Sequence, residues 1–284
     1  MKKQIKIISL LLIMLFSLTS CSFFESTTNN NVTNKVVDVE DFTINDFEDA
    51  VEIAIEKAEA SVISVTHTEG NMFGSTKSIG SAVVVKCQGK DSQGADTTDN
   101  ISYYEYLAVT NRHVVVTNRN IITKSLLVYL GNGNTMISAK VIDYSEKEDL
   151  ALISFTSEIY VPAASFADTT NLKRGSFVVA IGTPYDIVFD GSATFGIISY
   201  PLRYIEEEVF VLGGSSFQTC EVAYIQHDAA INSGNSGGGL FNMEGKLLGI
   251  NTMKITSSSS NVIEGMGFSI PIYTVKEVFK EYLK

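Results

Sequence analysis

The sequence predicts an all-β fold with a short helix at each end of the folded domain. Short runs rich in Val, Ile and Tyr recur through most of the chain, and each is bounded by Gly, Asn or Asp. Helical spacing of apolar residues occurs only near residues 46–60 and 272–284. Many short strands separated by turns are typical of antiparallel barrels or of a sandwich, so the pattern alone leaves both open.

The expected elements begin with a helix over residues 46–60, capped by Asp46, whose apolar residues fall on one face. The strands expected after it are residues 61–66, 80–87, 103–110, 126–130, 136–142, 150–155, 177–181, 193–199, 222–226, 239–242, 246–252 and 265–270. Two polar stretches, 88–102 and 203–220, are expected to be surface loops. The second carries the acidic run Glu206–Glu208, which usually marks a solvated face.

The N-terminus predicts an export signal. Three lysines within the first six residues precede an apolar run over residues 7–18, so residues 1–20 are expected to be a secretory signal peptide. The segment LTSC, ending at Cys21, resembles the lipobox of bacterial lipoproteins. That resemblance implies cleavage before Cys21 and lipidation of its sulfur, which would anchor the protein on the extracytoplasmic side of the cell membrane. An ordinary signal peptide with an incidental cysteine is the alternative.

Composition limits the remaining possibilities. Residues 21–45 are rich in Ser, Thr, Asn and Asp and predict a flexible tether before a folded domain over residues 46–284. The chain has 21 Lys and Arg against 32 Asp and Glu, and this net charge of −11 argues against a nucleic-acid partner. No cofactor or metal motif is recognised.

A glycine-framed serine is the first candidate for chemistry. Ser236 lies at the centre of residues 234–238 (GNSGG), between two apolar segments. Glycines permit a sharp turn, and the N–H groups of Gly234 and Ser236 are candidates for a joint oxyanion site. Acyl transfer needs such a hydroxyl nucleophile beside two donors. A plain turn between strands would look similar, so the rest of the chain has to decide.

A serine nucleophile needs a base and an orienting acid. Of the three histidines, His113 is the best base because an apolar strand ends there in a polar turn, whereas His67 and His227 lie within strands. Asp149 is the best acid because it precedes a strand that is almost wholly apolar, where a buried carboxylate needs a hydrogen-bonding partner. Asp143 and Asp228 are weaker rivals.

Together these segments resemble the HtrA/Deg family of trypsin-like serine proteases. The likeness is carried by TNRHVV around His113, DLAL at Asp149 and GNSGG around Ser236, in the order typical of the family. Similar segments also occur at residues 181–184, 194–199, 249–252 and 267–271, so the resemblance covers the chain from about Val51 onward.

The resemblance implies two six-stranded antiparallel β-barrels that meet near residues 160–175, with the active site between them. It also implies a His113–Asp149–Ser236 triad, an oxyanion hole of the Gly234 and Ser236 amides, and a substrate pocket lined by Ile231. The family's protease domains often form homotrimers, and residues 41–47 are a possible part of the interface. Members usually carry PDZ domains after the protease, and we expect none here. Whether Cys87 and Cys220 pair stays open.

The function expected from this reading is a surface-anchored serine endopeptidase that cleaves misfolded or extended polypeptides. Two alternatives remain. One is a pseudoprotease that uses the same barrels for chaperone-like binding, and the other is a narrow-specificity protease that matures a single partner. The intact His113, Asp149 and Ser236 favour an enzyme over the binding module, but the sequence does not separate the two kinds of protease.

Overall fold

The computed structural model describes residues 43–71, 74–116, 125–131, 135–210, 217–252 and 265–284, and helix α2 (Ile44–Glu59) is the first element within them. Thr43 is its N-cap, and a capping box joins Thr43 to Asp46 through the bonds Asp46 N to Thr43 Oγ1 (3.3 Å) and Thr43 N to Asp46 Oδ2 (2.6 Å). The helix therefore begins two residues before the predicted Asp46, which is the reciprocal partner of the cap. Such a cap contributes about 1 kcal/mol.

Seven antiparallel strands form the first sheet. They are β1 (Val62–Asn71), β2 (Gly74–Lys90), β3 (Tyr103–Asn111), β4 (Leu126–Tyr129), β5 (Met136–Ser138), β6 (Lys140–Ser145) and β7 (Leu150–Ser157), in the order β5-β4-β1-β2-β3-β7-β6. The edge strands β5 and β6 are separated in the chain by Ala139 alone. The sheet must therefore curl until its two edges meet, and β5 and β6 act as one bent strand of a six-stranded barrel.

Six strands close into the second barrel. They are β8 (Phe177–Gly182), β9 (Ser192–Phe210), β10 (Phe217–His227), β11 (Gly239–Asn242), β12 (Leu247–Thr252) and β13 (Gly267–Pro271), in the order β10-β13-β12-β11-β8-β9. The 3-10 helix η1 (Ile187–Phe189) lies between β8 and β9, and helix α4 (Ile272–Val278) follows β13. The predicted all-β class, with two curled antiparallel sheets and few helices, is confirmed.

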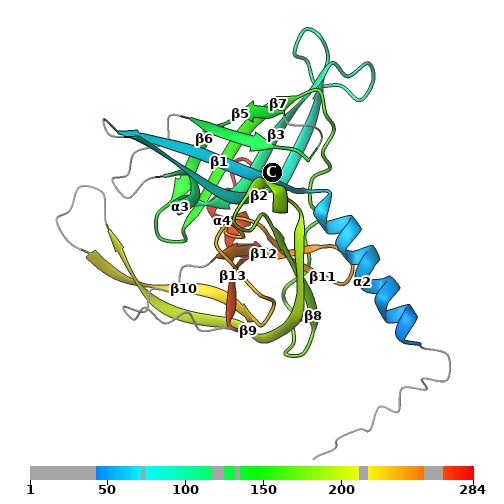
Figure 1. The fold of residues 1–284 in the computed structure, drawn as a ribbon, viewed down its shortest axis with the longest axis vertical. Helices are drawn as coiled ribbons and strands as arrows, with labels where there is room; N and C mark the ends of the chain where they lie inside the picture. Colours follow the sequence, from blue (N-terminus) through cyan, green and yellow to red (C-terminus); the bar gives the residue numbers. More distant parts are fainter. Residues whose placement is uncertain (1–42, 72–73, 117–124, 132–134, 211–216, 253–264) are drawn as a thin grey trace, which may run out of the picture. The chain divides into compact units, whose positions relative to one another are not determined.

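A shared core joins the two sheets. Val83, Val109 and Leu150 of the first sheet belong to the same buried cluster as Phe241 and Ile250 of the second barrel. Figure 1 shows the first sheet (cyan and green) lying against the barrel, with α2 beside them. Two of the cysteines pack against different clusters, Cys220 against this one and Cys87 against the interior of the first sheet. Within the described ranges, no helix combines the length and the apolar character needed to cross a bilayer.

The predicted loop over residues 203–220 is wrong. Strand β9 continues to Phe210 and β10 begins at Phe217, so most of this stretch is a two-stranded ribbon. Alternation along a strand explains the acidic run, because Glu206 and Glu208 face solvent whereas Glu207 is buried. The carboxylate of Glu207 accepts a hydrogen bond from the hydroxyl of the buried Tyr224, which offsets the cost of burying it.

Candidate active site

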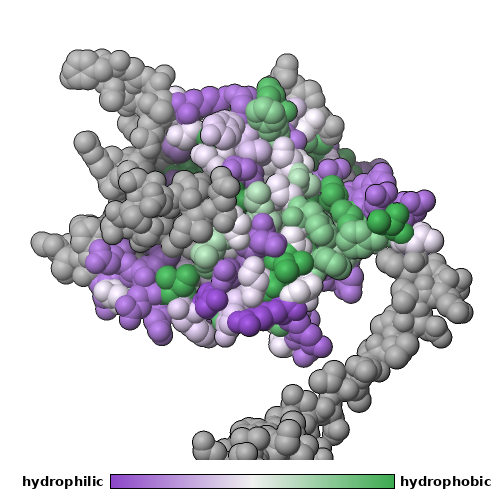
Figure 2. All heavy atoms as spheres, turned by 60° about the horizontal axis from the view of Figure 1, so that its bottom comes forward, coloured by the Kyte–Doolittle hydropathy of each residue, from purple (hydrophilic) through white to green (hydrophobic). Residues whose placement is uncertain are grey.

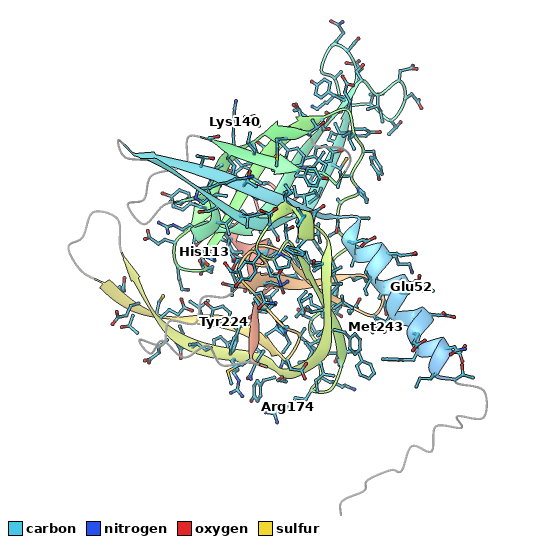
Figure 3. All side chains as sticks on the ribbon, viewed as in Figure 1. Glu52, His113, Lys140, Arg174, Tyr224 and Met243 are labelled. Atoms are coloured by element: carbon cyan, nitrogen blue, oxygen red, sulfur yellow. The ribbon has the colours of Figure 1, made fainter. Side chains whose placement is uncertain are left out.

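His113 and Asp149 meet through two hydrogen bonds. The sequence placed His113 at the end of a strand. In the structure it lies in the four-residue helix α3 (Arg112–Val115), which directly follows β3. Its backbone N–H donates to Asp149 Oδ1 (3.0 Å), and its ring Nδ1 lies 2.6 Å from Asp149 Oδ2. A carboxylate only accepts, so Nδ1 carries a proton, and in the neutral imidazole the other ring nitrogen, Nε2, then has its lone pair. Figure 3 shows His113 on the side of the first sheet that faces the barrel.

The backbone of Asp149 is held in an uncommon conformation. Its φ is +53°, in the left-handed region that Asp and Asn tolerate better than most residues. The carbonyl of Asp149 accepts from the Arg112 N–H (2.9 Å) and from Asn111 Nδ2 (3.1 Å). The carboxylate and the backbone carbonyl of Asp149 are thus both bonded to the segment that carries His113. Only 3% of Asp149 is exposed, so its carboxylate is shielded from competing water.

The rival candidates have other partners. The carboxylate of Asp143 accepts from the backbone N–H of Tyr144 (2.8 Å), and that of Asp228 accepts from the N–H of Ile197 (2.6 Å). His67 is buried in β1, and His227 is buried at the end of β10. Among the described residues, His113 and Asp149 are the predicted base and the predicted acid that are joined by a hydrogen bond. They are also the pair that the sequence favoured.

Ser236 lies in a loop whose backbone requires glycine at two positions. Gly234 and Gly237 have φ values of +99° and +85°. A Cβ on Gly237 would lie 2.1 Å from the Ser81 carbonyl oxygen and 2.2 Å from Thr110 Oγ1, so no side chain fits there. Among the described residues, the N–H groups of Gly234 and Ser236 donate no hydrogen bond, whereas those of Asn235, Gly237 and Gly238 all do. The two predicted oxyanion donors are therefore unengaged.

Ser81 of β2 connects this loop to the first sheet, a role that sequence reasoning missed. Its N–H donates to the Ser236 carbonyl (2.9 Å), and its hydroxyl donates to the Gly234 carbonyl (2.8 Å). The same hydroxyl accepts from the Thr183 N–H (2.9 Å), and the Ser81 carbonyl accepts from Thr110 Oγ1 (2.6 Å). One buried residue thus fixes the carbonyls on both sides of the Ser236 loop. Its only sequence signal was a serine after Gly80 at a strand start.

The neighbouring glycine brings Ser236 close to the His113 helix. A Cβ on Gly80 would lie 2.6 Å from a methyl carbon of Val114 and 3.3 Å from the Ser236 carbonyl oxygen. Val114 is the residue after His113 in α3, so the backbone of Gly80 separates α3 from the Ser236 loop by a single chain thickness. The backbone of Ser236 therefore lies near the helix that carries His113, and His113 is in turn bonded to Asp149.

The remaining predicted residues are Ile231 and Cys21. Ile231 is partly buried and packs against the apolar cluster of the second barrel, which includes Ala229 and Ile198. Its neighbour Ala230 accepts a hydrogen bond from Thr194 Oγ1 through its carbonyl (2.9 Å). Cys21 and the signal peptide lie outside the described residues. In the part of the chain that the structure describes, no group of three metal-ligating side chains comes together.

Comparison with known proteins gives consistent matches. The family model described as trypsin-like peptidase domain matches residues 80–250. The serine protease Do-like HtrA of Lactococcus lactis subsp. lactis (strain IL1403) is 34% identical over 239 residues, covering 80% of this chain and 55% of the relative. The serine protease Do-like HtrB of Bacillus subtilis (strain 168) is 33% identical, covering 88% of this chain and 51% of the relative.

A third relative matches over a shorter stretch. The probable periplasmic serine endoprotease DegP-like of Rickettsia conorii (strain ATCC VR-613 / Malish 7) is 36% identical over 178 residues, which is 63% of this chain and 32% of the relative. The chain thus spans less than two thirds of the length of the curated relatives that it matches.

Proposed function

The chain belongs to the trypsin-like peptidase domain family, and from this premise we propose that it is a serine endopeptidase acting on polypeptides. In this proposal Ser236 is the nucleophile, His113 the base and Asp149 the acid that orients the base. The observation that carries the proposal is the two-point contact between Asp149 and His113, made beside the loop of Ser236. The names of the relatives, all serine proteases of the HtrA or DegP-like type, support it.

The proposed reaction follows from where the protons lie. His113 Nε2 takes the proton of the Ser236 hydroxyl while the Ser236 oxygen attacks the peptide carbonyl carbon. The imidazolium that forms is stabilised by the Asp149 carboxylate at Nδ1. His113 then returns the proton to the leaving amine, and the peptide C–N bond breaks. Water, deprotonated by the same nitrogen, hydrolyses the acyl-enzyme and restores Ser236.

The amides of Gly234 and Ser236 are the proposed oxyanion donors. Both are unengaged among the described residues, so they can donate to the carbonyl oxygen as negative charge develops on it. The bonds from Ser81 to the carbonyls of Gly234 and Ser236 hold this loop before substrate arrives. A donor set in place beforehand needs no reorganisation during the reaction.

Substrates are proposed to be misfolded or extended chains, with a small or medium apolar residue before the scissile bond because Ile231 is aliphatic. A pseudoprotease that only binds such chains is the main alternative. A fluorophosphonate probe, which reacts with an activated serine, distinguishes the two. We expect purified protein to be labelled at Ser236, as located by mass spectrometry, and to cleave casein. A folded protein that does neither would favour the binding module.

The N-terminal anchor is proposed from the sequence, since Cys21 follows an apolar run and two small residues. We expect Cys21→Ser to move the protein from the membrane fraction to a soluble or unprocessed form, because the change removes the sulfur that carries the lipid. Fractionation followed by mass spectrometry of the mature N-terminus measures this. An unmodified Cys21 in the wild-type protein, or cleavage at another residue, would contradict the anchor.

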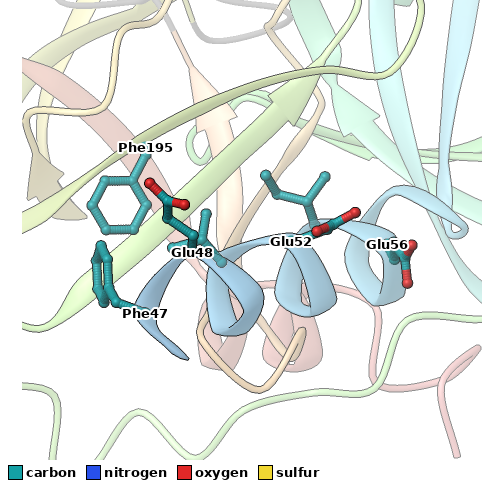
Figure 4. Close-up of a pocket in the computed structure, with 7 residues that line it drawn as sticks. Phe47, Glu48, Glu52, Glu56 and Phe195 are labelled. Carbon is teal, nitrogen blue, oxygen red and sulfur yellow. The ribbon is translucent and has the colours of Figure 1, made fainter. Parts of the chain in front are cut away.

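The surface around the start of α2 supports the proposal of a homotrimer. The rings of Phe47, Phe177 and Phe195 lie 5.3, 5.8 and 5.4 Å apart in pairs, and Phe177 and Phe195 are 45% and 41% exposed. Figure 2 shows apolar (green) side chains gathered on this side of the molecule. A pocket continues the surface along α2 and is lined by Phe47, Val51, Ile55, Phe195 and three glutamates (Figure 4). Exposed aromatic clusters of this kind mark interaction sites.

We expect Phe195→Asp to convert the oligomer to a monomer, because it places a charge in the middle of the proposed interface. Tyr160→Asp is the matched control, since Tyr160 is 61% exposed but packs on Tyr104 of the first sheet. Light scattering after size exclusion gives the mass of each variant. A wild-type monomer, or a Phe195→Asp protein that remains a trimer, would exclude this surface as the interface.

A further inference from the structure

A buried histidine that the proposed reaction does not use lies in the second barrel. His227 is the last residue of β10 and is fully buried. Its Nε2 lies 3.1 Å from the hydroxyl oxygen of Ser269 in β13. Its Nδ1 has no hydrogen-bond partner among the described residues. Burying an imidazole in an apolar barrel costs free energy unless its polar atoms form hydrogen bonds. The hydrogen bond between Nε2 and Ser269 is therefore expected to have a role.

The direction of each hydrogen bond in this group can be deduced. The side-chain amide of Asn251 donates through Nδ2 to the Gly239 carbonyl (2.9 Å), so its Oδ1 is an acceptor. The Ser269 hydroxyl donates its single hydrogen to that Oδ1 (2.9 Å). With that hydrogen directed at Asn251, the Ser269 oxygen accepts from His227, which puts the ring proton on Nε2. The competing tautomer carries the proton on Nδ1, facing the Ala229 carbonyl that also acts on the pKa of the ring, and would require the Ser269 hydroxyl to donate to Nε2 instead.

The ring is well suited to this tautomer. Burial lowers the pKa of His227 to about 4, so the imidazole is neutral at neutral pH. Gly267 lies against the ring, because a Cβ there would be 2.5 Å from the imidazole carbon Cε1 and 2.8 Å from Nδ1. The missing side chain of Gly267 thus provides the space in which the ring is held. A rotated ring would break the chain of donors.

The chain of hydrogen bonds ends at the loop of Ser236. The backbone carbonyl of Asn251 accepts from the Gly237 N–H (2.9 Å), and the Asn251 N–H donates to the Gly238 carbonyl (2.8 Å). Asn251 is therefore held by its side chain from the barrel interior, and with its backbone it holds the two residues that follow Ser236. The bonds from Ser81 fix the same loop from the other side.

We propose that His227 is a positioning residue for the peptidase reaction, acting through Ser269 and Asn251 on the loop that presents Ser236 and its amides. This inference rests on the proposed function. The path has five side-chain and backbone bonds, and none of its members is exposed. His227 touches no reacting atom and is needed to keep the loop in its reactive arrangement.

The test compares His227→Leu, which cannot donate, with His227→Gln, whose amide nitrogen reaches the place of Nε2. Each protein is treated with excess fluorophosphonate, and both the rate constant of labelling and the final labelled fraction are measured. We expect His227→Leu to label about 10-fold more slowly, less than the roughly 10²-fold or greater cost of removing an oxyanion donor. His227→Gln should recover most of the rate. His67→Leu, which replaces a buried histidine of the first sheet, should keep the wild-type rate.

The two measured quantities separate positioning from mere stability. A histidine that only stabilises the barrel would lower the labelled fraction and the unfolding temperature but leave the rate constant of the labelled molecules unchanged. That result for His227→Leu, with normal labelling of wild-type protein, would overturn the inference alone. Absence of labelling in wild-type protein would instead overturn the proposed function.

Two further measurements keep the inference testable if His227→Leu does not fold. Ser269→Ala breaks the same chain with a smaller change and should slow labelling to a similar extent. The double variant Ser269→Ala with His227→Gln should be no slower than Ser269→Ala, because both act through one path. Nitrogen NMR spectra of the wild-type protein do not depend on enzymatic activity. They should show Nε2 of His227 protonated and Nδ1 unprotonated at neutral pH. An Nδ1–H tautomer would refute the chain of donors.

Discussion

Replacing Ser236 with alanine is expected to remove fluorophosphonate labelling entirely and to lower casein cleavage by roughly 10⁶. The reason is that the variant has no oxygen to attack the carbonyl, whereas every other group of the site stays in place. The fold should persist, because the backbone bond from the Ser81 N–H to the residue-236 carbonyl does not involve the side chain. Thermal unfolding of the variant and of wild-type protein should therefore agree closely.

Ser233→Ala is the matched control for this change. Ser233 lies three residues earlier in the same loop, its side chain is exposed, and its carbonyl accepts from the Tyr185 N–H through a bond that the substitution keeps. It should label and cleave like wild-type protein. Labelling that survives Ser236→Ala, or that disappears with Ser233→Ala, would assign the nucleophile elsewhere.

Asp149→Asn is expected to give a folded protein whose kcat/KM is lower by roughly 10⁴. The Asn carbonyl oxygen can still accept the His113 backbone N–H, as Oδ1 of Asp149 does (3.0 Å). Its NH₂ group then faces the ring nitrogen Nδ1, which must become an acceptor. The proton moves to Nε2, and that nitrogen can no longer take the proton of Ser236.

Cleavage of a chromogenic peptide measures the loss, and Asp143→Asn provides the control. Asp143 accepts a bond from the Tyr144 N–H, so its replacement removes a carboxylate of the same sheet without touching His113. We expect it to stay within a few-fold of wild type. If the two variants changed places in this comparison, Asp143 would be the orienting acid.

Local sequence patterns account for much of this structure. Apolar runs bounded by turn residues located the strands because each run needs only its own alternation to be recognised. The predicted membership of the trypsin-like proteases is confirmed by the match over residues 80–250. The segments of His113, Asp149 and Ser236 were found for the same reason, since each has its signal within a few neighbouring residues. Their roles stay predictions until the variants above are measured.

What the sequence did not predict depends on contacts between distant residues. Ser81 bonds to Gly234 across 153 positions, and no pattern near Ser81 indicates that partner. Glu207 was assigned to a loop because an acidic run looks solvated, yet strand alternation turned it inward to Tyr224. His227 was set aside as a strand residue, and its connection to the Ser236 loop exists only once β10, β12 and β13 are neighbours.

The hydrogen bonds from Ser81 to the Ser236 loop have a consequence for the chain while it is still folding. The sheet that holds His113 against Asp149 comes from the first half of the domain, and Ser236 comes from the second. An unfolded or half-folded molecule has the nucleophile and the base in its sequence but no shared loop to bring them together. Under the proposed function, such a molecule cannot yet cleave a peptide bond, and its extended chain is a possible substrate for folded copies. The docking of the two sheets is therefore the step at which a newly made chain would acquire the proposed activity.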